Sequence, residues 1–522
     1  MKSFIVVTGG VISGLGKGIT ASTIGLLLKK RGINVTAVKI DPYLNVDAGT
    51  MSPYEHGECY VLNDGGEVDL DLGNYERFLD IDLSKNNNIT SGKVYKRVID
   101  KERNGDYLGK TVQIVPHVTN MIQSMILNAA TEDVCLIELG GTVGDIEGMP
   151  FVEAIKQLSM DHHVCFVHVS LLLKHGKEFK TKPTQSSIRE LNNRGIFPDI
   201  LCLRTPQSTN EEIKLKLQSL CRIKRANIID NTDVNNIYEV PALFDNQCII
   251  EKIANVLDLY VPQQADNYLQ DYIDMSKLLS NKTNPITCLV LGKYCENDDT
   301  YLSIVRSIEH ASLKCNVNPI IQMKSADLFK YNDPSIFTNV DCVIIPGGFG
   351  TRGIEEKIQA IQYCRENNIP ILGLCLGFQL MAIEFARNVC NIEKATNQEQ
   401  NSESGDHIII MNPECINEKM GASMRLGERK TTIIEDCKTK NEYQSDTIYE
   451  RHRHRYEFNN KYKSVMESNG LILIGDDHVD ILELVKHSYF IGCQFHPEYK
   501  SRLEKPHPLF VGLIKAAMNK SS

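Results

Sequence analysis

The sequence predicts two α/β domains, each built around a parallel β-sheet that is covered by helices. Its 522 residues exceed what one hydrophobic core usually supports. Short runs rich in β-branched residues alternate with longer amphipathic segments, which is typical of parallel sheets. A polar, weakly patterned stretch interrupts this alternation. We therefore expect one domain over residues 1–262, a linker over 263–285 and a second domain over 286–522.

The expected elements follow this alternation in order. FIVV (4–7) predicts the first strand, and ITASTIGLLLKKRG (19–32) predicts the first helix. Further strands are expected at 34–40, 134–139, 164–173 and 199–204, and ITCLVLGKY (286–294) starts the second domain. The stretch 164–173 is the longest strongly apolar one, but it is too short to span a bilayer. It predicts a buried strand and no membrane partner.

Charge and cysteine content narrow the class of protein. The formal net charge of −9 argues against a general nucleic-acid or anionic-membrane binder, so an anionic ligand needs a locally basic pocket. The 16 cysteines include no CxxC pair, and the first residues lack the length of a signal peptide. Reduced thiols and a cytoplasmic location are expected.

The glycine-rich stretch TGGVISGLGKGIT (8–20) joins the first strand to the first helix. Its backbone N–H groups and the helix N-terminus can hold phosphate oxygens, and Lys17 can supply a positive charge. The strict P-loop pattern is not met, because Val11 replaces its first glycine and Gly18 its Ser/Thr. Magnesium would therefore need other ligands. The alternative is a glycine-rich turn that binds nothing.

Carboxylates at expected strand ends are candidates for those ligands. Asp69 and Asp71 are expected to share one face of a strand, and Glu138 ends an apolar strand. Hard carboxylate oxygens, completed by phosphate and water, are what magnesium prefers. Taken alone, each carboxylate is more typical of a solvated surface charge, but together at expected strand ends they favour a site.

A basic stretch over residues 174–190 could bind a polyphosphate. Its lysines lie on a segment that we expect to be non-helical, because Gly176 and Pro183 interrupt it; they are Lys174, Lys177, Lys180 and Lys182. A solvated lysine-rich loop would look the same.

In the second half, IPILGLCLGFQL (369–380) has the pattern of a nucleophile elbow, with Cys375 between Gly373 and Gly377. Such a turn exposes the sulfur at a helix N-terminus, where a thiolate is favoured. The alternative is a buried structural cysteine.

Partners for that cysteine occur elsewhere in the same half. His496 is the expected base and Glu498 the residue that orients its ring. The amides of Gly347, Gly348 and Leu376 are expected to face an oxyanion.

The alternating run RHRHR (451–455) predicts an exposed strand with two different charged faces. Metal binding by His452 and His454 lacks further ligands and is disfavoured.

Taken together, the motifs resemble those of the CTP synthase family from residue 1 to about 515, and their sequences are similar to those of its eukaryotic branch. They are GGVISGLGKGI, KIDPYLNVDAGTMSPYEHGE, GGEVDLDLGNYERF, KERNGDYLGKTVQIVPHVT, IELGGTVGDIE, KTKPTQ, GLCLG, MRLG, ERHRHRYE and QFHPE. The resemblance implies a P-loop-like amidoligase domain followed by a class I glutamine amidotransferase domain with a flavodoxin-like fold. It implies that ATP phosphorylates UTP and that ammonia from glutamine then gives CTP.

The resemblance also implies a role for individual residues. The UTP set is Ser13, Lys180, Thr181, Lys182, Pro183, Thr184, Gln185 and Lys216, and the ATP set is Gly14, Leu15, Gly16, Lys17, Gly18, Ile19, Lys39 and Asp233. Asp71 and Glu138 would bind Mg²⁺, and Asp145, Ile146 and Glu147 would contact inhibitory CTP. Cys375, His496 and Glu498 match the triad, while Gly348, Leu376, Gly377, Phe378, Gln379, Glu399 and Arg455 match glutamine contacts.

Family membership further implies a homotetramer, activation by GTP and possible filaments. Two alternatives remain at this stage. One is an amidoligase of the cobyric acid synthase type that activates a carboxylate, which would not need KTKPTQ or DPYLNVDAGT. The other is a non-catalytic regulator or filament subunit, from which losses at Cys375, Lys17 or Glu138 would be expected.

Overall fold

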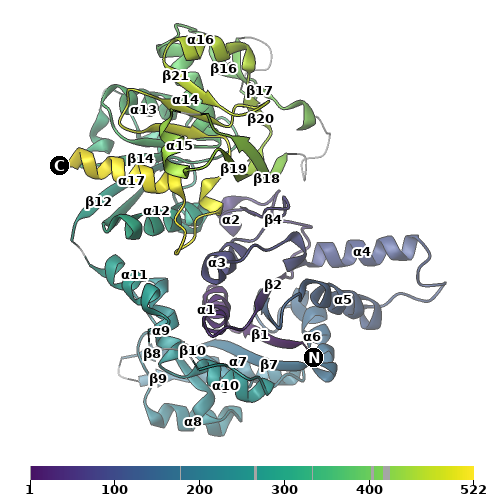
Figure 1. Cartoon of the computed structure of the whole chain (residues 1–522). Helices are drawn as coiled ribbons and strands as arrows, with labels where there is room; N and C mark the ends of the chain where they lie inside the picture. Colours follow the sequence, from purple (N-terminus) through teal and green to yellow (C-terminus); the bar gives the residue numbers. More distant parts are fainter. Residues whose placement is uncertain are drawn as a thin grey trace. The chain divides into compact units, whose positions relative to one another are not determined.

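The computed structural model describes residues 2–176, 178–263, 267–281, 283–331, 333–400, 405–415, 424–434 and 436–521. The chain forms two compact units, drawn in Figure 1. The first comprises residues 1–48 and 71–280, and the second 49–70 and 281–522. Lys177 of the expected basic stretch and residues 264–266 and 282 of the expected linker lie outside the described residues.

The first unit is a seven-stranded parallel sheet in the order β11-β10-β7-β1-β6-β2-β5. Its strands are β1 (Ser3–Gly9), β2 (Val35–Asp41), β5 (Asn88–Thr90), β6 (Val134–Leu139), β7 (His163–Leu171), β10 (Ile200–Thr205) and β11 (Ile228–Thr232), with a hairpin of β8 (Leu173–His175) and β9 (Glu178–Lys180). Because all seven strands run the same way, their carboxyl ends meet at one edge, where ligands bind in such sheets.

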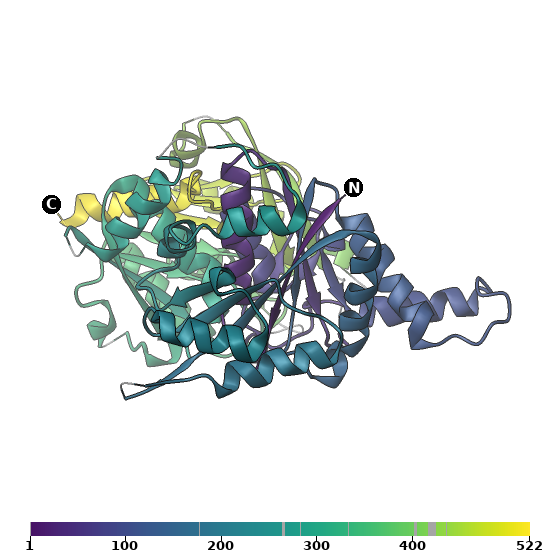
Figure 2. The same cartoon turned by 90° about the horizontal axis from the view of Figure 1, so that it is seen from below.

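The helices of the first unit pack against this sheet or against one another. They are α1 (Lys17–Lys30), α3 (Leu70–Leu79), α4 (Ser91–Arg103), α5 (Thr119–Ala129), α6 (Met149–Asp161), α7 (Lys182–Asn193), α8 (Glu211–Cys221), α9 (Val240–Asp245), α10 (Ile249–Leu257) and α11 (Gln270–Ser280). Helix α4 and the loop after it extend away from the sheet in both ribbon views (Figures 1 and 2). Leu108, in that loop, is 88% exposed.

The expected strands and the first helix are confirmed, but three details predicted for residues of the first unit are wrong. Asp71 lies in the first turn of α3 rather than on a strand. Lys182 and Pro183 start α7, where proline is tolerated because the first helical N–H groups need no partner. The expected linker contains α11, whose Tyr272 and Met275 are buried in the first unit.

The second unit contains a seven-stranded mixed sheet in the order β13-β12-β14-β15-β23-β22-β21. The first five strands in this order are parallel, and β22 is antiparallel to both of its neighbours. The strands are β12 (Pro285–Gly292), β13 (Asn318–Ser325), β14 (Cys342–Ile345), β15 (Ile371–Leu374), β21 (Leu471–Ile474), β22 (Ile481–Leu484) and β23 (Phe490–Cys493). Apolar clusters lie on both faces.

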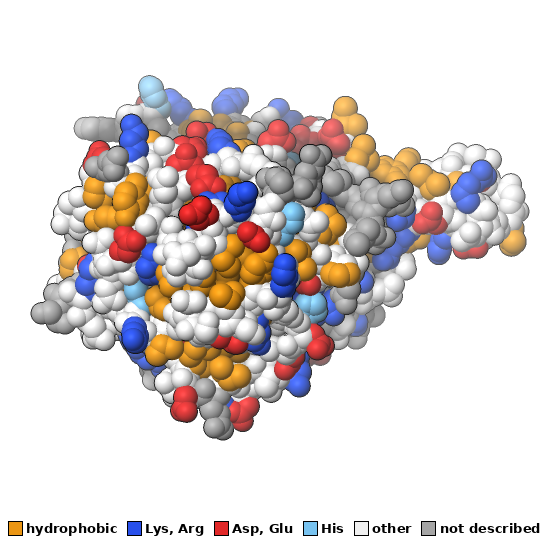
Figure 3. Space-filling view, turned by 90° about the horizontal axis from the view of Figure 1, so that it is seen from above, with side chains coloured by type: hydrophobic (Ala, Val, Ile, Leu, Met, Phe, Trp, Pro, Cys, Tyr) orange, Lys and Arg blue, Asp and Glu red, His pale blue; other side chains and the backbone are white. Residues whose placement is uncertain are grey.

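The remaining elements of this unit are smaller strands and the covering helices. The strands are β3 (Tyr60–Val61), β4 (Glu67–Val68), β16 (Ala395–Asn397), β17 (Asp406–Met411), β18 (Arg425–Thr432), β19 (Thr447–His454) and β20 (Tyr456–Phe458). The helices are α2 (Pro53–His56), α12 (Leu302–Cys315), α13 (Ile354–Glu366), α14 (Leu376–Asn388), α15 (Lys438–Tyr443), α16 (Lys463–Ser468) and α17 (Pro508–Ser521). On the face seen in Figure 3, acidic and basic side chains are interspersed with apolar ones.

Residues 49–70 pack in the second unit, although the sequence prediction had assigned them to the first domain. The fully buried Arg451 explains why. Its guanidinium donates to the Tyr60 hydroxyl at 3.1 Å, to the Val61 carbonyl at 3.1 Å and to Asn63 Oδ1 at 2.5 Å. Arg453 adds an ion pair to Glu67 at 2.9 Å.

The RHRHR run lies in β19 as far as His454, and the expectation that this strand is exposed is wrong. Arg451 and Arg453 hold residues 60–67, whereas His452 and His454 are buried on the opposite side. Among the described residues, no group of three or more His, Cys, Asp or Glu side chains is arranged to hold a metal ion by itself. None of the sixteen cysteines forms a disulfide, and no described helix is long and apolar enough to cross a membrane.

Lys357 in α13 gives a testable consequence of burial. The side chain is fully buried, and within the described residues its nitrogen has no hydrogen-bond partner. Burial lowers the pKa of Lys357 from 10.5 to about 8. Below pH 8 the buried charge lowers the free energy of unfolding by about 3 kcal/mol. This loss disappears as the pH approaches 10.5, because the unfolded chain then also releases the proton.

We therefore expect Lys357→Met to raise the free energy of unfolding at pH 7, with a gain that shrinks as the pH rises from 8 to 10. Chemical denaturation of both proteins at several pH values measures this. A gain that is independent of pH would contradict the explanation.

Candidate active site

The second unit places Cys375 at the turn between β15 and α14. Its backbone has φ 52° and ψ −98°, a strained conformation for a residue other than glycine. The two flanking glycines are sterically required, because a Cβ on Gly373 would lie 2.8 Å from the backbone of Gly377 and one on Gly377 would collide with the Ile345 carbonyl. This local geometry agrees with the expected nucleophile elbow.

His496 and Glu498 lie beside Cys375, directly after β23. His496 Nδ1 is 2.7 Å from Glu498 Oε1, so the carboxylate fixes the ring and leaves Nε2 for the sulfur. Burial alone would lower the pKa of His496, but the Glu498 carboxylate and the Cys375 sulfur outweigh it and raise the pKa to about 10. The imidazole of His496 is therefore readily protonated beside the sulfur.

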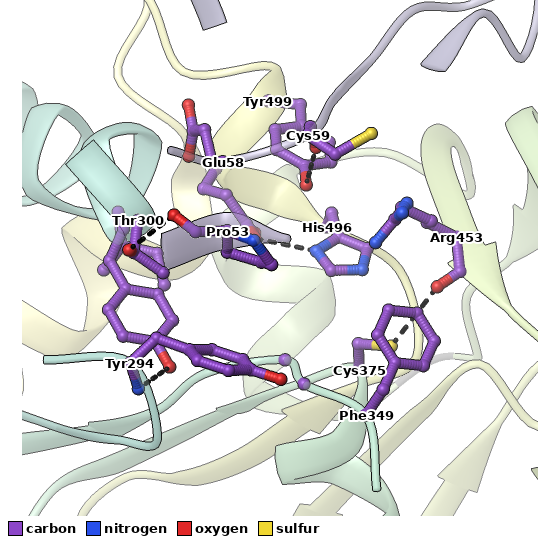
Figure 4. Close-up of a pocket in the computed structure, with 15 residues that line it drawn as sticks. Pro53, Glu58, Cys59, Tyr294, Thr300, Phe349, Cys375, Arg453, His496 and Tyr499 are labelled. Atoms are coloured by element: carbon purple, nitrogen blue, oxygen red, sulfur yellow. Dashed lines mark hydrogen bonds and ion pairs between the residues drawn. The ribbon is translucent and has the colours of Figure 1, made fainter. Parts of the chain in front are cut away.

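A cavity of about 80 Å³ connects these groups, and Figure 4 shows its lining. Cys375, His496 and the Gly347–Gly348 turn form one part of the wall. Residues from 49–70 form another part; they are Pro53, Glu58 and Cys59. The volume is sufficient for a small polar molecule.

The residues expected to contact glutamine divide into two groups. Gly348 lines the cavity, and the Glu399 carboxylate accepts from the Gly350 amide and lies near the Arg455 charge. Burial raises the pKa of Glu399. In contrast, the side chains of Phe378 and Gln379 are buried, so direct contacts from Phe378 could come only from its backbone.

The sequence prediction did not identify two groups that touch the sulfur. The Gln494 amide nitrogen lies 3.7 Å from Cys375 Sγ, and the Arg453 carbonyl oxygen lies 3.6 Å from it. Gln494 lies two residues before His496 within QFHPE. This proximity to the expected base was the only feature of the sequence that could have pointed to Gln494.

In the first unit, the glycine-rich loop connects β1 to α1, as expected. Lys17 is the first residue of α1, and its ammonium donates to the Gly141 carbonyl at 2.6 Å. Burial lowers the pKa of Lys17, and the Glu138 carboxylate opposes this shift. A Cβ on Gly9 would lie 2.6 Å from Lys17 Cδ, so this glycine leaves room for the lysine side chain.

Three carboxylates surround the ammonium of Lys39 in the first unit. Lys39 pairs with Asp71, with Glu138 Oε1 at 3.3 Å and with Asp41 Oδ1 at 3.7 Å. The Asp71 carboxylate also fills the space that a Cβ on Gly18 would need. This explains why glycine replaces the P-loop Ser/Thr, since a carboxylate stands there instead.

The donor set suits magnesium. Asp71 and Glu138 provide hard oxygens, and phosphate and water oxygens would complete the coordination. Tyr75 donates to the second oxygen of Glu138, which fixes that carboxylate.

The other expected nucleotide residues follow the carboxyl ends of neighbouring strands. The basic hairpin and the start of α7 follow β7, and Asp145–Glu147 follow β6. Asp233 follows β11 and pairs with Arg204 at 2.6 Å, while Lys216 lies on α8. The exposed Lys180 pairs with Glu178 at 2.5 Å, and Lys182 is exposed.

The strained cysteine, the His–Glu pair and the α/β sheet define the second unit as a glutamine amidotransferase domain. Residues 297–516 match the family model described as glutamine amidotransferase class-I, and residues 3–259 match that of the CTP synthase N-terminus. The chain belongs to the CTP synthase family.

Individual relatives agree with this family membership. A CTP synthase of Clostridium acetobutylicum is 46% identical, with 98% of each chain covered. One of Methanococcus aeolicus is 47% identical, with 99% of each chain covered. Among solved structures, the glutaminase domain of a Trypanosoma brucei CTPS with bound acivicin is 32% identical over 45% of this chain and 94% of that one, with a TM-score of 0.42.

Proposed function

We propose that this chain converts UTP to CTP in pyrimidine biosynthesis, with ATP as the phosphoryl donor and glutamine as the nitrogen source. The observation that carries the proposal is the presence of two intact sites in one chain. The second unit has Cys375 on a strained turn beside a His–Glu pair. The first has a glycine-rich loop, Lys17 and a carboxylate cluster at the carboxyl edge of a parallel sheet.

The second unit releases ammonia. Cys375 Sγ attacks the carboxamide carbon of glutamine, and ammonia leaves with a proton from His496. Water then attacks the thioester, the sulfur leaves, and glutamate is released. Gly348, Leu376, Gly377, Phe378, Gln379, Glu399 and Arg455 are the proposed glutamine contacts, with the backbone serving at Phe378.

The first unit activates UTP. The terminal phosphoryl group of ATP passes to the 4-oxygen of the uracil ring. Ammonia then attacks the ring carbon that carries this oxygen, and the oxygen leaves as part of phosphate. Lys17 stabilises the charge on the transferred group. Asp71 and Glu138 would hold Mg²⁺, which when bound neutralises phosphate charge.

We assign the remaining nucleotide contacts as the family resemblance implies. The UTP contacts are Ser13, Lys180 to Gln185 and Lys216, and the ATP contacts are Gly14 to Ile19, Lys39 and Asp233. Asp145, Ile146 and Glu147 are assigned to CTP, which inhibits by competing with UTP because the two share a triphosphate.

Assembly and regulation are also proposed from family membership. GTP is the expected activator, and the chain is expected to form a homotetramer, with filaments as a further possibility, in the cytoplasm. The eukaryotic branch suggested by the sequence stays a prediction, because the two full-length relatives named above are bacterial and archaeal.

One assay tests the proposed function. CTP formation is measured with UTP, ATP, glutamine, GTP and Mg²⁺, leaving out one at a time. We expect no CTP without ATP or UTP, restoration of the glutamine-free reaction by ammonium salts, and slower glutamine-dependent synthesis without GTP. Conversion of a carboxylate substrate in place of UTP would contradict the proposal.

A further inference from the structure

Gln494 is placed to act directly on the reactive sulfur. Its side chain is 1% exposed, and its amide nitrogen lies 3.7 Å from Cys375 Sγ. This distance is within reach of a hydrogen bond to sulfur, which is longer than one to oxygen. Neither the proposed triad nor the proposed glutamine contacts include this residue.

The surrounding hydrogen bonds determine which end of the Gln494 amide faces the sulfur. Gln379 Nε2 lies 3.1 Å from the Tyr456 carbonyl, which can only accept, so this end of Gln379 is its NH₂ group. The same nitrogen lies 3.2 Å from Gln494 Oε1, to which it donates its second hydrogen. The oxygen of Gln494 is thus engaged, and its NH₂ group faces Cys375.

Two further contacts hold this orientation in place. Asn397 donates to Gln379 Oε1 at 3.2 Å, so both ends of the Gln379 amide are engaged. The Tyr456 carbonyl also accepts from His454 Nδ1 at 2.9 Å, and burial lowers the pKa of His454 to about 3, so this histidine is neutral and has a fixed tautomer. Flipping the Gln494 amide would break this buried network, which is costly.

The sulfur therefore has one acceptor and one donor beside it, in addition to His496. The Arg453 carbonyl, at 3.6 Å, can accept from the thiol but repels a thiolate. The Gln494 amide can donate to a thiolate. When the thiol proton passes to His496 Nε2, the sulfur keeps the electron pair, and the donor becomes the favourable neighbour.

We infer that Gln494 is a catalytic residue of the glutaminase site, whose amide N–H stabilises the Cys375 thiolate. The inference rests on the proposed function and adds a residue to it. The same donor acts twice, because the sulfur is charged before it attacks glutamine and again when it leaves the thioester. Gln379 acts through Gln494 and is a positioning residue in this role.

The test substitutes Gln494→Met, which removes the donor and roughly keeps the volume. The rate of Cys375 alkylation by iodoacetamide is measured against pH in the full-length protein, together with glutamine hydrolysis. We expect the midpoint of the alkylation profile to rise by about one pH unit and kcat for glutamine hydrolysis to fall about tenfold or more. The glutamine KM should change less than kcat, since the lost contact is to the enzyme's own sulfur.

Two further variants make the result specific. Gln362→Met places the same substitution on a partly exposed position of α13, where the amide donates to Glu366, and should leave both readouts unchanged. Gln494→Glu keeps the shape but replaces the donor by a charged acceptor, so it should raise the alkylation midpoint more than Gln494→Met does.

An unchanged alkylation profile and kcat in Gln494→Met would overturn the inference. So would a Gln494→Glu protein whose profile matches that of the wild type. Failure of the proposed function is a different result, in which the wild-type protein itself does not hydrolyse glutamine. Thermal unfolding of each variant identifies loss of folding, and a folded Gln494→Glu decides the outcome if Gln494→Met does not fold.

Discussion

Cys375→Ala is expected to abolish glutamine hydrolysis and glutamine-dependent CTP formation while CTP formation from ammonium salts continues. The substitution removes the only sulfur on the strained turn beside His496, and no other group there replaces it as nucleophile. The groups proposed for phosphoryl transfer belong to the other unit and are untouched. Because NH₃ is the nucleophile, the ammonia-dependent rate should rise with pH.

The measurement compares CTP formation from glutamine and from ammonium chloride between pH 7 and 9 in the two proteins. A second substitution, Cys364→Ala, serves as a control, since this buried thiol lies in the apolar cluster of α13. Continued use of glutamine by Cys375→Ala would mean that another thiol is the nucleophile. Loss of the ammonia reaction in a folded protein would contradict the division into two sites.

Local patterns predicted the sharp turn at Cys375 correctly because all the constraints lie within a few residues. A strand, a small residue on each side of the cysteine and an apolar helix are enough to specify the turn, and the structure shows that the space at Gly373 and Gly377 is filled by backbone atoms. The parallel strands were predicted for the same reason, since their β-branched runs are continuous.

Charged and polar patterns were misinterpreted where the partner is distant in sequence. Alternating arginines usually mark a solvated strand, but Arg451 is fully buried by Tyr60, Val61 and Asn63, about 390 residues earlier. The sequence near residue 451 does not indicate that carbonyl and hydroxyl groups so far away accept hydrogen bonds from this arginine. The placement of residues 49–70 in the second unit was missed for the same reason.

Asp71 illustrates a different limit. VDLDL alternates with period two and was therefore assigned to a strand, whereas the chain turns into α3 at Leu70. The carboxylate nevertheless reaches the expected place, because it packs against Gly18 at the start of α1. The need for a carboxylate near the glycine-rich loop was predictable from the missing Ser/Thr of that loop, but the helical conformation at Asp71 was not.

Gln494 was missed because a glutamine two residues before a histidine matches no known motif spacing. From sequence alone it cannot be distinguished from a residue of the protein core.

Lys17→Ala is expected to lower CTP formation by about 10²-fold or more, with glutamine and with ammonia alike. Phosphoryl transfer precedes nitrogen entry, so supplying free ammonia cannot bypass the loss. The side chain runs across Gly9 from the start of α1, and its charge lies among Glu138, Asp71 and Asp41, where the phosphates and Mg²⁺ are proposed to bind.

Steady-state CTP formation from each nitrogen source measures this, with Lys30→Ala at the other end of α1 as the matched control. Lys17→Arg separates charge from shape, since a planar guanidinium keeps the charge but does not fit the space above Gly9. We expect little rescue by arginine. Cys375 should still be alkylated at the wild-type rate in Lys17→Ala, which shows that the second unit is intact. Ammonia-dependent synthesis at more than a tenth of the wild-type rate in Lys17→Ala would show that this lysine is a buried structural charge rather than part of the phosphoryl-transfer site.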